Sequence, residues 1–153
     1  MADNTREFDY DMTKSKVELC RASHEAMGEW LSGFPWNWYT THTFAKADTT
    51  PRQADRRWQS WLNTLNLQCK VLDLPRPAYA RVTEYQQRGT IHYHALIAGV
   101  EPVRRLLFKD LWEVHGFARV EAYDHERGAT FYLGKYLTKT DGDIRLSWSL
   151  IKK

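Results

Sequence analysis

Hydrophobic positions in the first half of the chain predict a helix, a strand and a second helix. Over residues of about 13–31, apolar side chains recur at helical spacing until the SGFP segment ends the pattern. The segment WNWYTTHTFA, 36–45, is rich in aromatic and β-branched residues, which favours a strand. Thr50 and Pro51 are typical of a helix start, so we predict a helix over 49–70. The predicted apolar face of this helix comprises Trp58, Trp61, Leu62 and Leu65.

The central segments predict a β-hairpin and a third helix. AYARVTEYQ, 78–86, and TIHYHALIAG, 90–99, have strand patterns and are separated by a short turn. In segment 101–116, Pro102 lies near a helix start and Gly116 lies just past its end. We expect the apolar side of that helix to comprise Val103, Leu106, Leu107, Leu111 and Val114.

The last two predicted elements complete a known order. FARVEAY, 117–123, predicts a short strand, and ERGATFYLGKYLTKT, 126–140, predicts a helix that stops near Gly142. The order is therefore β-α-β-β-α-β, with one further helix at each end. This is the order of an α+β, ferredoxin-like split βαβ fold, in which two helices cover one face of an antiparallel sheet.

The hairpin register brings three metal-ligand types together. If residues 87–89 form the loop, with Gly89 in the left-handed conformation, then Glu84 pairs with His92. His94 shares their face because side chains alternate along a strand. Two imidazole nitrogens and a carboxylate can bind a divalent metal and leave positions open for substrate. Six histidines in the chain make the pair alone weak evidence, and Glu84 and His92 could equally form a surface ion pair.

The last predicted helix carries two phenols and two amines on one stripe. Tyr132, Lys135, Tyr136 and Lys139 follow i, i+3, i+4 and i+7 spacing. A phenol has a pKa near 10, so it needs a neighbouring cation or metal to act as a nucleophile at neutral pH. The alternative is an amphipathic helix in which the tyrosines pack and the lysines are solvated. Leu133 and Leu137 take a different stripe and can face the sheet.

Composition narrows the function classes. The 153 residues suffice for about one domain, and their net charge of +3 permits an anionic partner. Aromatic residues make up 14% of the chain, which suits base stacking as well as core packing. The two cysteines support neither a disulfide framework nor a cysteine zinc site. With no apolar run of membrane-spanning length, we expect a soluble intracellular protein that does not bind membranes.

Three motifs carry a resemblance to a known family. HYHALI is similar to the His-hydrophobic-His motif of the HUH endonuclease superfamily, and YLGKY is similar to its Tyr-x-x-Lys motif. WYTTHTF resembles the strand of the first motif in rolling-circle replication initiators, or Rep proteins. The resemblance covers about residues 36–140. It implies a nuclease domain over 36–141, preceded by a helical extension over 1–35 and followed by a tail over 142–153.

The resemblance also implies roles for individual residues. Glu84, His92 and His94 would bind Mg²⁺ or Mn²⁺, and Tyr132, three residues before Lys135, matches the nucleophile. In this family the tyrosine attacks single-stranded DNA at an origin, and leaves a 5′-phosphotyrosine and a free 3′-OH. Tyr136 fits the two-tyrosine initiators of small DNA phages, so the resemblance leaves open whether one or both tyrosines act. Lys135 would help to hold the phosphate or its metal.

We expect further DNA contacts from basic side chains. Arg52 and Arg56 begin one predicted helix, Arg81 and Arg88 lie in or near the hairpin, and Lys139 ends the tyrosine stripe. Tyr39, Trp36 and Trp38 could stack bases or pack in the core. His42 shares its strand face with no other ligand candidate, so we expect a hydrogen-bonded structural residue.

The resulting hypothesis is a monomeric rolling-circle initiator that nicks and rejoins single-stranded DNA or an origin hairpin. No ATP-binding loop is evident, so a host helicase and polymerase would be its partners. It would act in the cytoplasm of a bacterial host, or in the nucleus for a eukaryotic virus. The alternatives are a dimeric HUH transposase and a non-catalytic domain that binds single-stranded DNA or RNA. Relaxases carry their tyrosine upstream of the histidines, which argues against that class.

Overall fold

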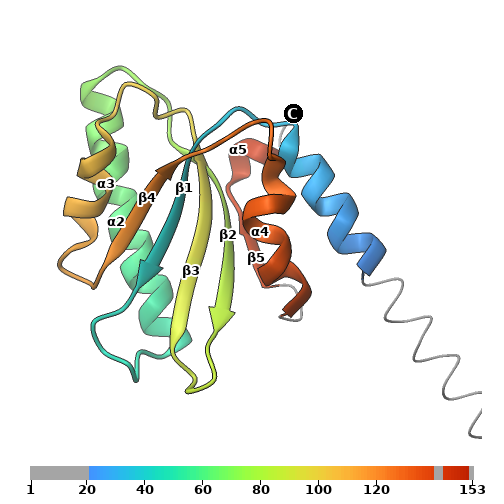
Figure 1. The fold of residues 1–153 in the computed structure, drawn as a ribbon. Helices are drawn as coiled ribbons and strands as arrows, with labels where there is room; N and C mark the ends of the chain where they lie inside the picture. Colours follow the sequence, from blue (N-terminus) through green and yellow to red (C-terminus); the bar gives the residue numbers. More distant parts are fainter. Residues whose placement is uncertain (1–20, 140–142, 152–153) are drawn as a thin grey trace, which may run out of the picture.

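A computed structural model describes residues 21–139 and 143–151 of the chain (Figure 1). Its elements, in chain order, are a helix over residues 21–32, β1 (Trp36–Thr43), α2 (Pro51–Val71), β2 (Ala78–Tyr85), β3 (Ile91–Ala98), α3 (Arg105–Trp112), β4 (Ala118–Ala122), α4 (Gly128–Lys139), β5 (Ile144–Leu146) and α5 (Trp148–Ile151). Within these described residues, no helix has the length and apolar character needed to cross a membrane.

The sheet has five strands in the order β4-β1-β3-β2-β5, and every neighbouring pair is antiparallel. The first four strands follow the predicted β-α-β-β-α-β order, so the α+β fold with an antiparallel sheet is confirmed. β5 and α5 lie in the segment expected as a tail. β5 pairs with β2 and adds an edge strand that sequence patterns did not predict.

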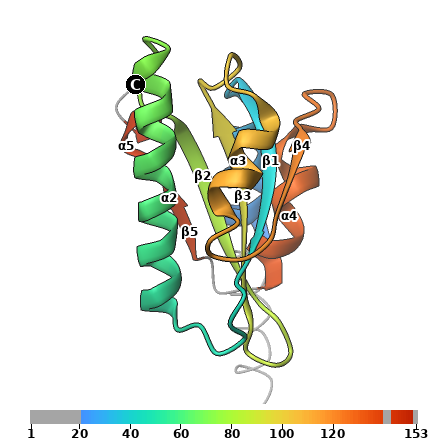
Figure 2. The same ribbon diagram turned by 90° about the vertical axis from the view of Figure 1, so that its left-hand side faces the viewer.

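Helices cover both faces of the sheet. α2 and α3 lie on one side, and α4 lies with the N-terminal helix on the other (Figures 1 and 2). The alternation along β3 matches this division, because Tyr93 and Ala95 belong to the core under α2 and α3. Leu96 and Ala98 belong to a second core under α4, together with Leu133 and Leu137 as predicted. Two hydrophobic cores therefore meet at one central sheet.

The long helix α2 begins where the sequence predicts. The Thr50 side chain accepts a hydrogen bond from the Gln53 backbone, and the Gln53 side chain accepts one from the Thr50 backbone. This capping box satisfies two backbone N–H groups that would otherwise lack partners. Trp58, Trp61 and Leu65 are fully buried against the sheet. The predicted start and the predicted apolar face are both confirmed.

The prediction of which α3 residues form its buried apolar side is partly wrong. Leu106 is 48% exposed and Val114, which lies beyond the helix end, is 82% exposed, whereas Phe108 and Trp112 are completely buried. Trp112 donates its indole N–H to the Thr43 carbonyl, 2.9 Å away. Two large aromatic side chains one turn apart thus determine which side of α3 meets the sheet, and the leucine spacing does not.

His42 is a structural residue, as its strand face suggested. Its ring is completely buried and packs edge-on against Trp58, Trp61 and Trp112. Its Nε2 atom lies 2.9 Å from the Thr40 hydroxyl. Burial, with a smaller effect from the nearby His94, lowers the pKa of His42 to about 3. The neutral ring is therefore part of the aromatic core at physiological pH.

We predict that this buried histidine makes the fold sensitive to mild acid. The unfolded chain takes up a proton near pH 6.5, whereas folded His42 does not until about pH 3. Stability from this group is thus complete above pH 6.5 and falls by roughly 1.4 kcal/mol per pH unit between those values. Urea unfolding at several pH values measures the slope. His42→Gln should flatten it, and His125→Gln, at an exposed position, should not. Equal slopes in all three proteins would contradict the prediction.

Residue 116 must be glycine because no room is left for a side chain beside β1. A side chain there would collide with the backbone of β1, because its Cβ would lie against the Thr43 carbonyl and 2.9 Å from the Phe44 Cα. The close approach lets the segment after α3 run beside β1.

Gly116→Ala should therefore lower the free energy of unfolding by about 1–3 kcal/mol, as overpacking does elsewhere. Gly33→Ala is the matched control, since its Cβ would meet the Trp30 carbonyl at an ordinary 3.4 Å. Urea titrations of the two variants should differ in midpoint. Equal midpoints would show that the backbone at residue 116 moves away at no cost.

Candidate functional site

The hairpin has the predicted register. Glu84 lies opposite His92, the Gln86 N–H donates to the Thr90 carbonyl, and Gly89 has a φ of 76°. This left-handed conformation in the loop is the one that glycine adopts most readily. The register places Glu84, His92 and His94 on the face that α4 covers, and away from α2.

Glu84 and His94 form the closest contact of this group. The His94 Nε2 atom lies 2.7 Å from a Glu84 carboxylate oxygen, and the His94 side chain is 4% exposed. His92 is farther away, since its Nδ1 lies 4.0 Å from the same oxygen and 3.1 Å from the Gln86 amide nitrogen. The carboxylate therefore lies between the two histidines but pairs closely with one.

Metal binding by these residues stays a prediction. In the described part of the chain, no three His, Cys, Asp or Glu side chains are arranged to hold a metal ion. At this site the His92 Nδ1 atom faces the Gln86 amide, and the His94 Nε2 atom forms a hydrogen bond with the Glu84 carboxylate that an ion would have to replace. The donor types fit Mg²⁺ or Mn²⁺, and a rotation of the His92 ring would be needed to direct a nitrogen to the same point as Glu84 and His94.

Two residues of β1 complete the surroundings of His94, and sequence analysis missed this role. The Tyr39 hydroxyl lies 3.0 Å from His94 Nδ1, and the Thr41 hydroxyl lies 3.4 Å from it. Both follow from the pairing of β1 with β3, which sets Thr41 opposite His94. The alternation of WYTTHTF puts Tyr39 and Thr41 on one face, but that segment alone does not reveal its neighbouring strand.

The electrostatics of this group favour a neutral imidazole. Burial lowers the pKa of His94, although the hydrogen bond and charge of Glu84 act in the opposite direction. Burial also raises the pKa of Tyr39, as does the neighbouring Tyr136. Tyr39 thus stays a hydroxyl at neutral pH, and hydroxyls can donate to or accept from either tautomer of His94.

The two tyrosines of α4 are in different environments. Tyr136 stacks on His94, with ring centroids 3.6 Å apart and planes 8° from parallel. The Tyr132 ring lies between Tyr39 and Tyr123, at 4.8 and 5.0 Å, and its hydroxyl accepts the Asp124 backbone N–H at 2.9 Å. Tyr136 therefore covers the histidine, and Tyr132 lies one helical turn away toward β4.

Two open hollows flank the ring of Tyr136. One, of about 530 Å³, lies on the hairpin side and includes Glu84 and Arg88 in its lining. The other, of about 480 Å³, includes Tyr39, Tyr132 and Lys135. The Lys135 amine lies 5.5 Å from the centre of the Tyr136 ring. A ligand that spans both hollows would cross both tyrosines, the lysine and the carboxylate.

The predicted basic contacts are scattered over the molecule. Arg88 lies at the site, whereas Arg52 and Arg56 are exposed on α2 across the sheet. Arg81 is 3% exposed, pairs with Asp55 at 2.8 Å and lies over the Tyr93 ring, so it belongs to the core under α2. The side chain of Lys139 lies outside the described part of the structure. Arg127, which sequence analysis did not select, lines the hollow beside Tyr132.

The sequence pattern of the replication-associated protein family ORF2 matches residues 37–141, a segment that starts in β1 and includes all of α4. The chain belongs to this family. No curated protein and no solved structure matches the chain. The matched segment of this replication-associated protein includes the hairpin, the Tyr39 and Thr41 hydroxyls of β1, and the tyrosine helix.

Proposed function

We propose that this ORF2-family chain is the nicking and joining enzyme of rolling-circle replication, with the chemistry of an HUH endonuclease. It would cut single-stranded DNA through a 5′-phosphotyrosine intermediate. The observation that carries the proposal is the packing of the tyrosine helix on the Glu84, His92 and His94 face, with Tyr136 stacked on His94. Membership of a replication-associated family supports the biological setting.

Glu84, His92 and His94 would hold Mg²⁺ or Mn²⁺. A bound ion would neutralise charge on the scissile phosphate. Ligation through Nε2 requires that His94 carry its proton on Nδ1, and the Tyr39 and Thr41 hydroxyls can accept that proton in a hydrogen bond. The lowered pKa of His94 favours the neutral ring that ligation needs. The surroundings of His94 therefore suit a metal ligand.

The phenol oxygen of a tyrosine would attack phosphorus and form a P–O bond to the new 5′ end. The bond from phosphorus to the 3′ oxygen breaks, and that oxygen leaves as a hydroxyl after taking up a proton. Attack by a 3′-OH on the phosphotyrosine reverses these steps and joins strands. No external energy source is needed, because one phosphodiester bond replaces another.

The positions of the two tyrosines support different roles. Tyr136 lies against His94 and borders both hollows, which supports it as the first nucleophile. The Tyr132 oxygen accepts an N–H from Asp124, which fixes its position one helical turn away from His94. Tyr132 would receive the strand in a second transfer. Lys135, between them on the same stripe, would pair with the phosphate.

The tyrosines can be tested with labelled single-stranded DNA and Mn²⁺, by looking for a covalent adduct on a denaturing gel. Tyr136→Phe should reduce adduct formation by at least about a thousandfold, because the nucleophile is removed. Tyr132→Phe should keep the adduct and lose transfer of a second strand. Phe117→Leu removes an exposed aromatic ring that lines neither hollow and should match the wild type.

Three outcomes would contradict this assignment. If the wild-type protein forms no adduct with a random-sequence library of single strands and hairpins, it is a binding domain without nicking activity. An adduct that survives the combined Tyr132→Phe and Tyr136→Phe changes would place the nucleophile outside α4. If Tyr132→Phe alone abolished the first adduct, the order of the two tyrosines would be reversed.

Metal binding has a separate test, by calorimetric titration of Mn²⁺ into the protein without DNA. His92→Ala and Glu84→Gln should abolish measurable binding, and far-UV circular dichroism should stay unchanged because both side chains are partly exposed and lie outside the hydrophobic cores. Tyr39→Phe should weaken binding by about tenfold, as loss of a ligand's hydrogen-bond partner does. Phe117→Leu is again the control. Equal affinity in His92→Ala and wild type would exclude this metal site.

A further inference from the structure

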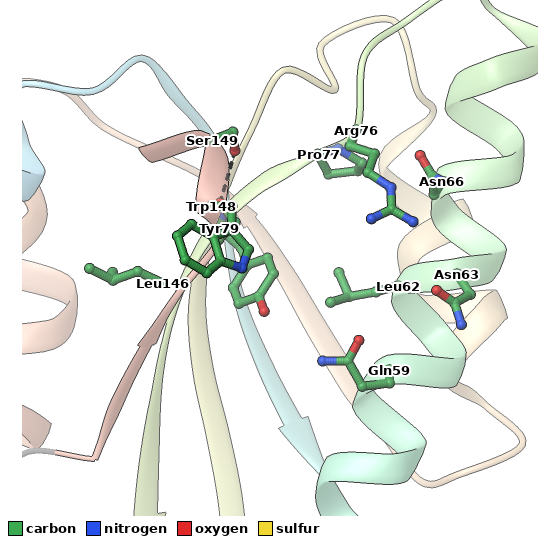
Figure 3. A pocket seen from close by; sticks show the side chains of 11 residues that line it. Gln59, Leu62, Asn63, Asn66, Arg76, Pro77, Tyr79, Leu146, Trp148 and Ser149 are labelled. Carbon is green, nitrogen blue, oxygen red and sulfur yellow. Dashed lines mark hydrogen bonds between the residues drawn. The ribbon is translucent and has the colours of Figure 1, made fainter. Parts of the chain in front are cut away.

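A cavity of about 360 Å³ lies between α2 and the edge of the sheet, on the side opposite the tyrosine helix (Figure 3). Its walls come from α2, from the start of β2 and from the segment that joins β5 to α5. This volume falls within the range of about 300–1,000 Å³ that is usual for small-ligand sites. The cavity shares no lining residue with the hollows beside Tyr136.

A buried amide without a partner faces this cavity. Asn66 is 8% exposed, lines the cavity, and its side-chain oxygen has no hydrogen-bond partner among the described residues. An unsatisfied buried acceptor is destabilising, so a ligand that donates an N–H there would be favoured. Asn63 and Gln59 add two more amides from the same helix (Figure 3).

The opposite wall presents an exposed indole on a fixed support. Trp148 is 74% exposed, whereas Leu150, two residues later, is 5% exposed and packs in the core under α4. The Ser147 hydroxyl and backbone N–H bond to the backbone of Tyr79, at 2.9 and 3.0 Å, which fixes α5 to β2. The indole is therefore held at the cavity without being needed for the core.

The charge of the lining suits an anion. Arg76 is the one charged residue among those found to line the cavity, and Figure 3 shows its guanidinium extending from the loop before β2 toward the α2 wall. The combination is an exposed aromatic ring, three amides and a cation. These groups match the flat face, the pairing edge and the phosphate of one nucleotide.

We propose that this cavity binds one unpaired nucleotide of single-stranded DNA, with its base against Trp148, its pairing edge at the α2 amides and its phosphate at Arg76. Every base has an N–H on its pairing edge, so Asn66 would accept from any of them. The inference rests on the proposed function in taking single-stranded DNA as the ligand, and it adds a second contact away from the nicking site.

The test is fluorescence anisotropy of labelled single-stranded oligonucleotides with the full chain in EDTA, where metal-dependent chemistry is absent. Trp148→Leu should weaken binding by about tenfold, the usual effect of losing one stacked base. Phe117→Leu removes an aromatic ring that is 59% exposed elsewhere and should have no effect. Arg76→Gln should lower the slope of log affinity against log salt by about 0.7, whereas Arg104→Gln should not.

A second readout reports the stacking directly. An oligonucleotide that contains 2-aminopurine should lose fluorescence on binding to the wild type and to Phe117→Leu, and should keep it with Trp148→Leu. Unchanged affinity and quenching in Trp148→Leu would overturn the proposal. So would an equal loss in Phe117→Leu, which would indicate a diffuse surface, or a deoxynucleoside monophosphate that binds and is not displaced by the oligonucleotide.

The two proposals fail in distinguishable ways. Trp148→Leu should still form the covalent adduct at saturating DNA, because Trp148 is not part of the tyrosine site. The combined Tyr132→Phe and Tyr136→Phe variant should still show Trp148-dependent binding in EDTA. If the protein passes the binding test but forms no adduct, the nicking proposal is refuted and the cavity proposal is not.

Discussion

The alternation of side chains along β3 is the constraint on which the rest of the structure depends. β3 lies in the middle of the sheet and bonds to both β1 and β2. Its odd-numbered residues face α2 and α3 and complete the aromatic core there. Its even-numbered residues face α4; they are the two histidines and two members of the second core. A shift of one residue would bury His92 and His94 among tryptophans and turn Tyr93 toward α4. One register thus fixes the core and the site together.

Local features of the site could be predicted from sequence, and its non-local features could not. The Glu84 to His92 pairing follows from a short loop with a left-handed glycine, and the stripe on α4 follows from helical spacing. Tyr39 and Thr41 reach His94 only because β1 lies beside β3, and the order of strands is not encoded within any one segment. Arg81 could be placed in the hairpin, but its burial against Asp55 depends on α2 packing across that face.

The same distinction explains the errors in the predicted elements. The leucine spacing in α3 misled because Phe108 and Trp112 bury more surface and determine the helix orientation. β5 has three residues, too few for an alternating pattern, and exists because β2 has an unpaired edge to accept it. The family match ends at residue 141, so β5 and Trp148, which lines the cavity, lie beyond the matched segment.

The positions of the two proposed DNA contacts bear on why the substrate would be single-stranded. Tyr79, beside the cavity, and Glu84, beside the tyrosine helix, are five residues apart on β2 and point to opposite faces, a distance of roughly 17 Å along the strand. DNA that touches both must turn around the sheet edge at β5. A duplex resists such a turn, because its persistence length is about 50 nm, whereas a single strand can follow it. The geometry of the sheet edge would then select unpaired DNA before any base is read.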